Sequence, residues 1–240
     1  MSHHGGARRG RGAPLALALA ALVACACGER AARPHATTAG IPDPAREEMA
    51  RALEPRVPAR LRPLLRDSLR ITLTPSTLIP AFRYHWGSWT PPGADTALRA
   101  LAVTAGGEAA AVRDAHEWSN AIGRVGWSPS SFHQAAFACA EAARAAGSGP
   151  RPEAALYLNP RSLRGWTIGD AAAARRLRSP VVTHVGGAWN RWRAQVWMAE
   201  PGRAVRYRCL FTPHVGRRGP LVELVPTDSI AGVGLPPADR

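Results

Sequence analysis

Residues 181–225 read VVTHVGGAWNRWRAQVWMAEPGRAVRYRCLFTPHVGRRGPLVELV, and two segments of this stretch alternate between apolar and polar side chains. Successive side chains of a β-strand point to opposite faces, so a period of two predicts strands with one buried and one solvated face. Glu200-Pro201-Gly202 lies between the two segments, and Pro followed by Gly suits a type II turn. The stretch therefore predicts an antiparallel hairpin. Its expected buried residues are Trp192, Ala194, Val196, Met198, Val205, Tyr207, Cys209 and Phe211.

The chain has 240 residues and a formal net charge of +14, and every one of its 31 basic residues is arginine. The lack of lysine excludes a P-loop lysine, a Schiff-base lysine and a Ser-Lys nucleophile. Alanine, glycine and proline are also abundant, which is the residue set that a GC-rich coding sequence favours. The positive charge is therefore explained either by biased composition on a solvated surface or by a binding site for a polyanion.

The N-terminus has the pattern of an export signal. Arg8, Arg9 and Arg11 precede an apolar run over residues 13–24, which is shorter than the roughly 20 residues that span a bilayer. Leu22-Val23-Ala24-Cys25 ends this run and resembles the lipobox of bacterial lipoproteins. The resemblance implies that Cys25 is acylated, becomes the new N-terminus and tethers the exported chain to a membrane. The alternative is ordinary secretion with cleavage after Ala24-Cys25-Ala26.

The expected fold is α+β, with an N-terminal helical layer packed on a C-terminal antiparallel β-sheet. Helices are expected to start at Asp43-Pro44 and to cover 96–105, 108–122 and 128–146, with strands at 71–74 and 82–86. Tyr84, Trp86 and Trp89 are interpreted either as core or as a sugar-stacking platform. The predicted organisation is a signal peptide over 1–24, a flexible tether over 25–42, a helical region over 43–149, an antiparallel β region over 150–229 and a loose tail over 230–240.

Cys139 lies on the apolar face of a predicted helix and Cys209 on the apolar face of a predicted strand. In an oxidising compartment they are candidates for a disulfide, and the alternative is two buried free thiols. The four cysteines and the scattered histidines have no metal-ligand spacing. The sequence therefore predicts no metal site and no cofactor.

One enzyme family offers a second resemblance, carried by short motifs. Gly106-Gly107-Glu108, and later Ala155-Leu156-Tyr157 with Asn159-Pro160 and Trp166, are similar to segments of the SleB-type cell-wall hydrolases. The similarity implies cleavage of peptidoglycan strands with a glutamate as acid, and the candidates are Glu108 and Glu117, in a groove with Tyr157 and Trp166. This chain departs from the family pattern at Thr104, where the family has its first glutamate, and at Gly106, where it has arginine.

Two functions follow from these patterns. The first is a non-catalytic binding or structural lipoprotein of the cell envelope, held to either membrane by its lipid. Its solvated hairpin face would meet lipid head groups, an acidic glycan or another envelope protein, unless that face is simply a wet surface. The residues concerned are Arg191, Arg193, Arg206 and Arg208. The second is a peptidoglycan hydrolase or a degenerate relative. Nucleic acid is not an expected partner, because export removes the chain from it.

Overall fold

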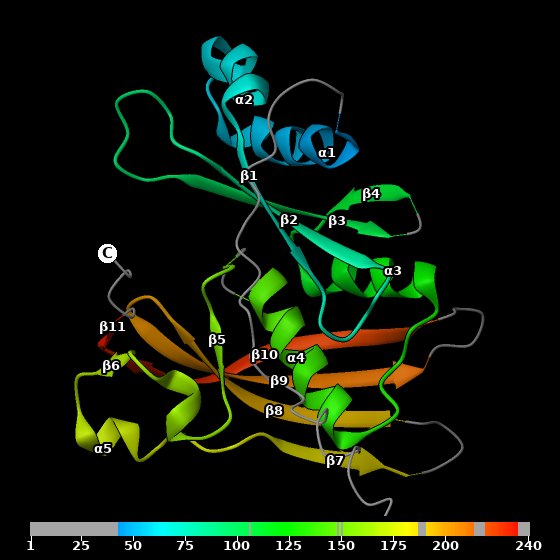
Figure 1. The fold of residues 1–240 in the computed structure, drawn as a ribbon, viewed down its shortest axis with the longest axis vertical. Coiled ribbons are helices and arrows are strands. Elements are labelled where there is room, and N and C mark those ends of the chain that lie inside the picture. The colour runs from blue at the N-terminus through cyan, green and yellow to red at the C-terminus, as the bar shows by residue number, and fades with distance from the viewer. Residues whose placement is uncertain are drawn as a thin grey trace, which may run out of the picture. The chain divides into compact units, whose positions relative to one another are not determined.

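In the computed structural model, the described residues are 43–105, 107–147, 149, 151–186, 191–213 and 219–234. They all belong to one compact unit, Pro34–Arg240. This unit combines helices with antiparallel sheets, which confirms the predicted α+β class (Figure 1). The predictions for the leader and the tether over 1–42, and for the tail over 235–240, lie outside the described residues.

An N-terminal sheet, which the sequence did not predict as a whole, occupies the middle of the supposed helical region. Its strands pair in the order β1-β2-β3-β4, each antiparallel to the next. They are β1 (Arg70–Pro75), β2 (Phe82–Trp89), β3 (Leu98–Ala105) and β4 (Glu108–Ala111). The expectation of a helix over 96–105 was therefore wrong, and the helix expected over 108–122 is divided between β4 and the helix that follows. Because helices cover both faces of the central strand β3, its small apolar residues lack the alternation that marks a strand.

Two short helices cover one face of this N-terminal sheet. They are α1 (Pro44–Leu53) and α2 (Arg62–Ser68), separated by the 3-10 turns η1 (Glu54–Arg56) and η2 (Ala59–Leu61). The predicted helix start is confirmed, because the Asp43 side chain accepts a hydrogen bond from the Ala45 N–H at 3.0 Å. Met49, Leu65 and Trp89 meet in the small core between helix and sheet.

Helices α3 (Ala115–Val125) and α4 (Phe132–Ala146) lie on the other face of the N-terminal sheet. Tyr84 and Trp86 point toward them, whereas Trp89 points toward α1 and α2. All three aromatic side chains are buried, so the core interpretation is confirmed and the sugar-stacking platform is not formed. The alanine-rich face of α4 leaves little side-chain bulk between helix and strands, which permits close packing on both sides.

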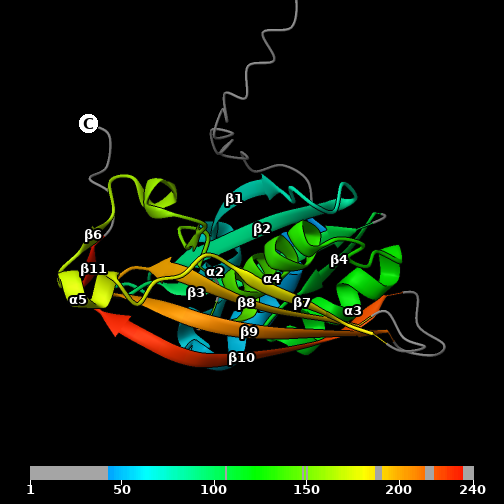
Figure 2. The same cartoon turned by 90° about the horizontal axis from the view of Figure 1, so that it is seen from below.

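The C-terminal sheet covers the remaining side of α3 and α4. Its strands pair in the order β10-β9-β8-β5, and β7 pairs with the other half of β8 (Figures 1 and 2). They are β5 (Ala155–Tyr157), β7 (Val181–Val185), β8 (Arg191–Glu200), β9 (Arg203–Pro213) and β10 (Pro220–Ala231). The hairpin of β8 and β9 is the one predicted, and Gly202 has the positive φ of 86° that its turn needs. The predicted apolar face of the hairpin is buried against α4.

Among the described residues, a small layer covers one end of the outer face of the C-terminal sheet. There Trp197, Ala204 and Ile230 contact this layer, which includes Leu163 and Leu177. The layer contains η3 (Pro160–Leu163), β6 (Thr167–Ile168), α5 (Ala171–Ala174) and β11 (Val233–Gly234). Because β10 continues through residues 230–231 and β11 pairs with β6, the expectation of a loose tail from 230 was wrong as far as residue 234.

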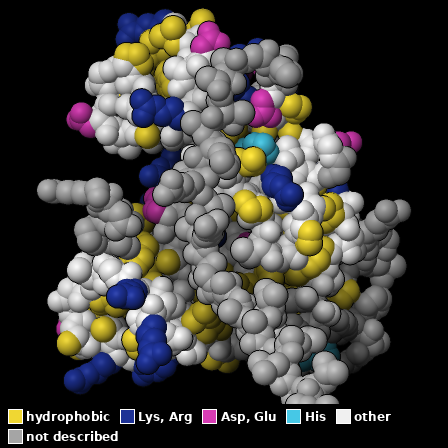
Figure 3. Space-filling view, viewed as in Figure 1, with side chains coloured by type: hydrophobic (Ala, Val, Ile, Leu, Met, Phe, Trp, Pro, Cys, Tyr) yellow, Lys and Arg dark blue, Asp and Glu magenta, His cyan; other side chains and the backbone are white. Residues whose placement is uncertain are grey.

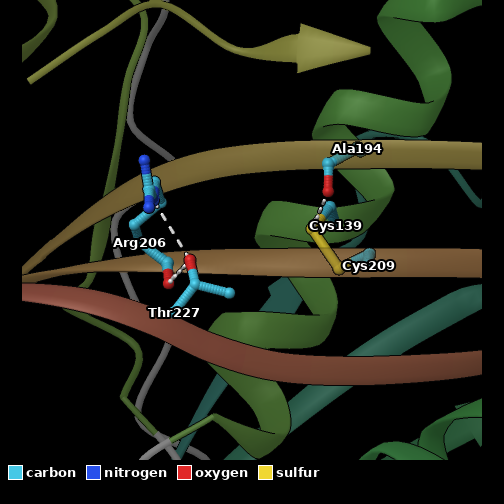
Figure 4. Close-up of a disulfide and its surroundings, with 5 residues drawn as sticks. All are labelled: Cys139, Ala194, Arg206, Cys209 and Thr227. Carbon is cyan, nitrogen blue, oxygen red and sulfur yellow. Dashed lines mark hydrogen bonds between the residues drawn. A yellow bond between two sulfur atoms is a disulfide. The ribbon is translucent and has the colours of Figure 1, made fainter. Parts of the chain in front are cut away.

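Cys139 and Cys209 form a disulfide that joins α4 to β9 (Figure 4). The sulfur atoms are 2.09 Å apart and the Cα atoms 5.6 Å apart. Of the two interpretations of this cysteine pair, the structure has the bonded one. The bond fixes the central helix layer to the C-terminal sheet across 70 residues of sequence.

Candidate functional site: an arginine face on the C-terminal sheet

Four arginines project from the same outer face of the C-terminal sheet. In β8, Arg191 and Arg193 alternate with buried residues that face α4, so they point away from that helix. The strand register places Gln195 opposite Arg208, and directly paired residues of antiparallel strands share a face. We call this surface the arginine face. It consists of Arg191, Arg193, Arg206 and Arg208.

Arg206 is held in place by its neighbours. Its guanidinium carbon lies 5.8 Å from the ring centroid of Trp197, within the range of a cation–π contact. Its Nε donates a hydrogen bond of 3.1 Å to Thr227 Oγ1, and the Thr227 hydroxyl donates to the Arg206 carbonyl oxygen, also at 3.1 Å (Figure 4). This arginine therefore marks the boundary where the arginine face meets the covered end of the sheet.

The other three arginines have charged ends without protein partners among the described residues. Arg191, Arg193 and Arg208 are exposed and form no ion pair or side-chain hydrogen bond there. Elsewhere, basic side chains lie at several separate places on the side of the molecule drawn in Figure 3, and several arginines are ion-paired, as Arg99 is with Glu153. Unpaired positive charge on a solvated face remains available to an anionic partner.

The surroundings of the arginine face are partly apolar. Val181 of β7 and Val225 of β10 stand on the same side and are 56% and 41% exposed. Glu223 of β10 also faces this way and forms no ion pair with a described residue. A solvated sheet face of this composition suits an extended anionic surface better than a small molecule, which needs a concave site.

The carboxylates of the hydrolase alternative lie elsewhere. Glu117, at the start of α3, accepts hydrogen bonds from the Arg113 backbone N–H at 2.6 Å and from Arg113 Nε at 2.9 Å. Glu108, at the start of β4, forms an exposed ion pair of 3.4 Å with Arg124. Both carboxylates are thus bound to arginines, unlike the carboxyl of a general acid, which an apolar pocket keeps protonated.

The structure also separates these glutamates from the aromatic residues expected beside them. Tyr157 and Trp166 belong to the small layer at the covered end of the C-terminal sheet. Glu117 instead lines a groove of about 330 Å³ between α1, β4 and α3, and neither aromatic residue lines that groove. The expectation of one groove with all four residues was therefore wrong.

Sequence reasoning missed a buried glutamate in α4. Glu141 accepts hydrogen bonds from Ser76 Oγ at 2.8 and 2.9 Å, from the Thr77 N–H at 3.2 Å and from the Tyr84 hydroxyl at 2.8 Å. The Trp118 indole N–H donates to the Tyr84 hydroxyl at 3.1 Å. All three donor residues lie within 76–84, far from Glu141 along the chain, and the signal in the sequence was a single acid within the alanine-rich run of 135–146. The cluster anchors the loop after β1 to α4.

Burial, reinforced by the negative charge of Glu141, raises the pKa of Tyr84 well above its usual value. The unfolded chain ionises this tyrosine near pH 10, whereas the folded chain keeps it protonated. The unfolded state therefore binds fewer protons above about pH 10, and the free energy of unfolding should fall there by up to about 1.4 kcal/mol per pH unit. Urea unfolding of wild type and Tyr84→Phe between pH 8 and pH 11 tests this, with Tyr157→Phe as control. The free energy of unfolding should fall less steeply with pH in Tyr84→Phe than in wild type, and as steeply in Tyr157→Phe as in wild type. Equal slopes in all three proteins would contradict the role given to Tyr84.

A second buried carboxylate closes the β8–β9 hairpin. Glu200 is 1% exposed, accepts a hydrogen bond of 2.9 Å from the Tyr207 hydroxyl and pairs with Arg203 at 3.3 Å. Gly147, at the end of α4, permits this arrangement, because a Cβ there would lie 2.6 Å from the Tyr207 hydroxyl oxygen. Like Glu141, Glu200 bonds to other residues of the protein, so we assign it a role in stabilising the fold.

The described part of the chain contains no group of three or more His, Cys, Asp or Glu that could hold a metal ion. None of its helices is both long and apolar enough to cross a membrane. Cys25, the predicted acylation site, lies outside the described residues.

Comparison of the chain with protein-family models, with curated proteins and with solved structures finds no match in any of the three.

Proposed function

We propose that this chain is a lipid-anchored protein of the bacterial cell envelope, without catalytic activity, whose arginine face binds an anionic membrane surface. The observation that carries the proposal is the charge of Arg191, Arg193 and Arg208 on one sheet face, where none of the three pairs with a described residue. Each buried CH₂ of the acyl chains on Cys25 would contribute about 0.8 kcal/mol, and a basic patch adds electrostatic attraction to anionic lipid. Each arginine near an anionic bilayer contributes about 1 kcal/mol.

The lipid anchor is the first part to test. Expression in a bacterium that processes lipoproteins should give a membrane-bound chain whose first residue is an acylated Cys25. The Cys25→Ser variant should remain without lipid. Mass spectrometry of the purified N-terminus reads both results, and an unmodified residue 1 on a soluble chain would reject the anchor.

Charge reversal tests the arginine face. The combination of Arg193→Glu with Arg208→Glu should weaken binding to phosphatidylglycerol vesicles by at least about 30-fold, since two contacts of about 1 kcal/mol are lost. Co-sedimentation of the non-acylated Cys25→Ser chain with the vesicles measures the binding, and phosphatidylcholine vesicles give the background.

The matched control is Arg56→Glu with Arg60→Glu, which changes the net charge equally at exposed positions near α1 and α2. This control should bind almost as wild type does. If both pairs weaken binding equally, the net charge of the chain is responsible and the arginine face has no special role.

A further inference from the structure

The outer edge of β4 is an open edge of the N-terminal sheet. The Val112 N–H donates to the Leu101 carbonyl at 2.9 Å, which identifies these two residues as a hydrogen-bonded pair. Hydrogen-bonded and non-hydrogen-bonded pairs alternate along antiparallel strands, so Ala110 bonds to β3. The N–H and C=O groups of Ala109 and Ala111 then point away from β3. None of these four groups has a hydrogen bond to a described residue.

This edge is accessible and lies inside a groove. The groove has a volume of about 330 Å³, and Ala109, Ala110 and Ala111 form part of its lining. Methyl side chains leave the backbone polar groups unshielded. The walls are Glu48 of α1 on one side and a row of α3 residues on the other. That row is Glu117, Asn120, Ala121 and Arg124.

Helix α3, which lines this groove, forms side-chain hydrogen bonds to the edge strand of the C-terminal sheet. Ser119 of α3 donates to the Pro220 carbonyl at 2.8 Å and accepts from the Val222 N–H at 3.3 Å, both in the edge strand β10. Pro226 and a register shift interrupt that strand further along. These features protect an edge against pairing with another chain. The edge of β4 has neither a proline nor a side chain bonded to Ala109 or Ala111 among the described residues.

We propose that this groove binds a short extended polypeptide segment, which pairs with β4 as a fifth strand of the N-terminal sheet. Backbone groups of Ala109 and Ala111 would supply the hydrogen bonds, as in other cases of β-strand addition. A second copy of this chain is a poor occupant, because its own β4 is recessed between α1 and α3 and cannot enter an identical recess. Carboxylates and guanidinium groups line the walls, so the segment has small or polar side chains rather than large apolar ones.

Hydrogen exchange of the full chain, followed by NMR, tests the geometry and the binding together. The probe is acetyl-Ser-Thr-Val-Thr-Ser-amide, and the control peptide carries N-methyl groups on its two threonines. In the free chain, the Ala109 and Ala111 amides should exchange much faster than the Ala110 amide. Saturating probe should slow exchange at Ala109 and Ala111 at least 10-fold and leave Ala110 unchanged. The N-methylated peptide, which lacks donors on one edge, should bind at least 10-fold more weakly.

Two variants locate the effect on the edge of β4. Ala109→Pro removes an outward N–H without removing a bond to β3, so it should abolish probe binding while Ala110 stays protected. Ala109→Ser keeps the N–H and should bind as wild type does. The variant with Arg193→Glu and Arg208→Glu should bind the probe as wild type does. Peptide binding at β4 and membrane binding by the arginine face can therefore fail independently. Protection of the Ala109 and Ala111 amides without probe, no binding at millimolar probe, or equal binding of the N-methylated peptide would overturn the proposal.

Discussion

Replacement of Glu141 by alanine is expected to lower the free energy of unfolding by about 3–5 kcal/mol. The carboxylate accepts hydrogen bonds from three residues on the side of the N-terminal sheet, Ser76, Thr77 and Tyr84, and Ser76 and Tyr84 are buried with it. Removal of the acceptor leaves these buried donors without their partner. Urea denaturation at pH 7 measures the change.

The control for this variant is another glutamate with a single exposed partner. Glu153 pairs with Arg99 at the surface, and Glu153→Ala should lower the free energy of unfolding by less than about 1 kcal/mol. Glu141→Gln adds a second comparison, since an amide keeps one acceptor but presents two donors to groups that all donate to Glu141. The free energy of unfolding of Glu141→Gln should lie between those of wild type and Glu141→Ala. A Glu141→Ala effect no larger than that of Glu153→Ala would show that the buried cluster does not stabilise the fold.

Loss of the disulfide is expected to have an effect of similar size. Cys139 and Cys209 enclose a loop of about 70 residues, and chain entropy predicts a stabilisation of about 4 kcal/mol for that length. The double variant Cys139→Ala with Cys209→Ala should therefore unfold at much lower urea concentration than the oxidised wild type.

A reducing agent provides the internal control. Dithiothreitol should destabilise the wild type to near the level of the double variant and should leave the double variant unchanged. Mass spectrometry after alkylation counts the free thiols before and after reduction. If both cysteines of the untreated protein react with the alkylating agent once unfolded, they are free thiols and the bonded structure is wrong for the isolated protein.

The C-terminal hairpin was predictable because only one side of it is buried over most of its length. Trp192 and Tyr207 face α4, while Arg193 and Arg208 face water, so the period of two survives in the sequence. The common outward direction of the four arginines follows from the same alternation. Whether they bind an anionic surface depends on a partner, which strand geometry does not specify.

The N-terminal sheet was not predictable in the same way. β3 is covered on both faces by helices, so after Arg99 it reads as a continuous run of alanine, leucine and valine from Ala100 to Val103. Alanine favours helices in isolation, and tertiary packing overrides that preference here. The short strand β4 then takes the first residues of what resembles a longer amphipathic helix ending at Val125.

The buried clusters depend on contacts between distant segments, which local patterns do not contain. Glu141 meets Tyr84 from 57 residues away and Ser76 from 65 residues away. Within its own helix it appears as an ordinary surface acid beside Arg144. Only the packing of α4 between two sheets turns it inward, and a single sequence gives no sign of that arrangement.

Helix α4 is attached to its two neighbours in chemically different ways. Cys139 and Glu141 are two positions apart, about 200° around the helix, so one joins the C-terminal sheet covalently and the other holds the loop of the N-terminal sheet by charged hydrogen bonds. Neither half of the chain therefore contains a complete hydrophobic core by itself. A break near residue 149 would separate the C-terminal strands from the helix that shields them, and would expose the alanine-rich surface of the N-terminal piece to water. We therefore expect the described residues to fold as one unit, although most of their strands divide between two large sheets.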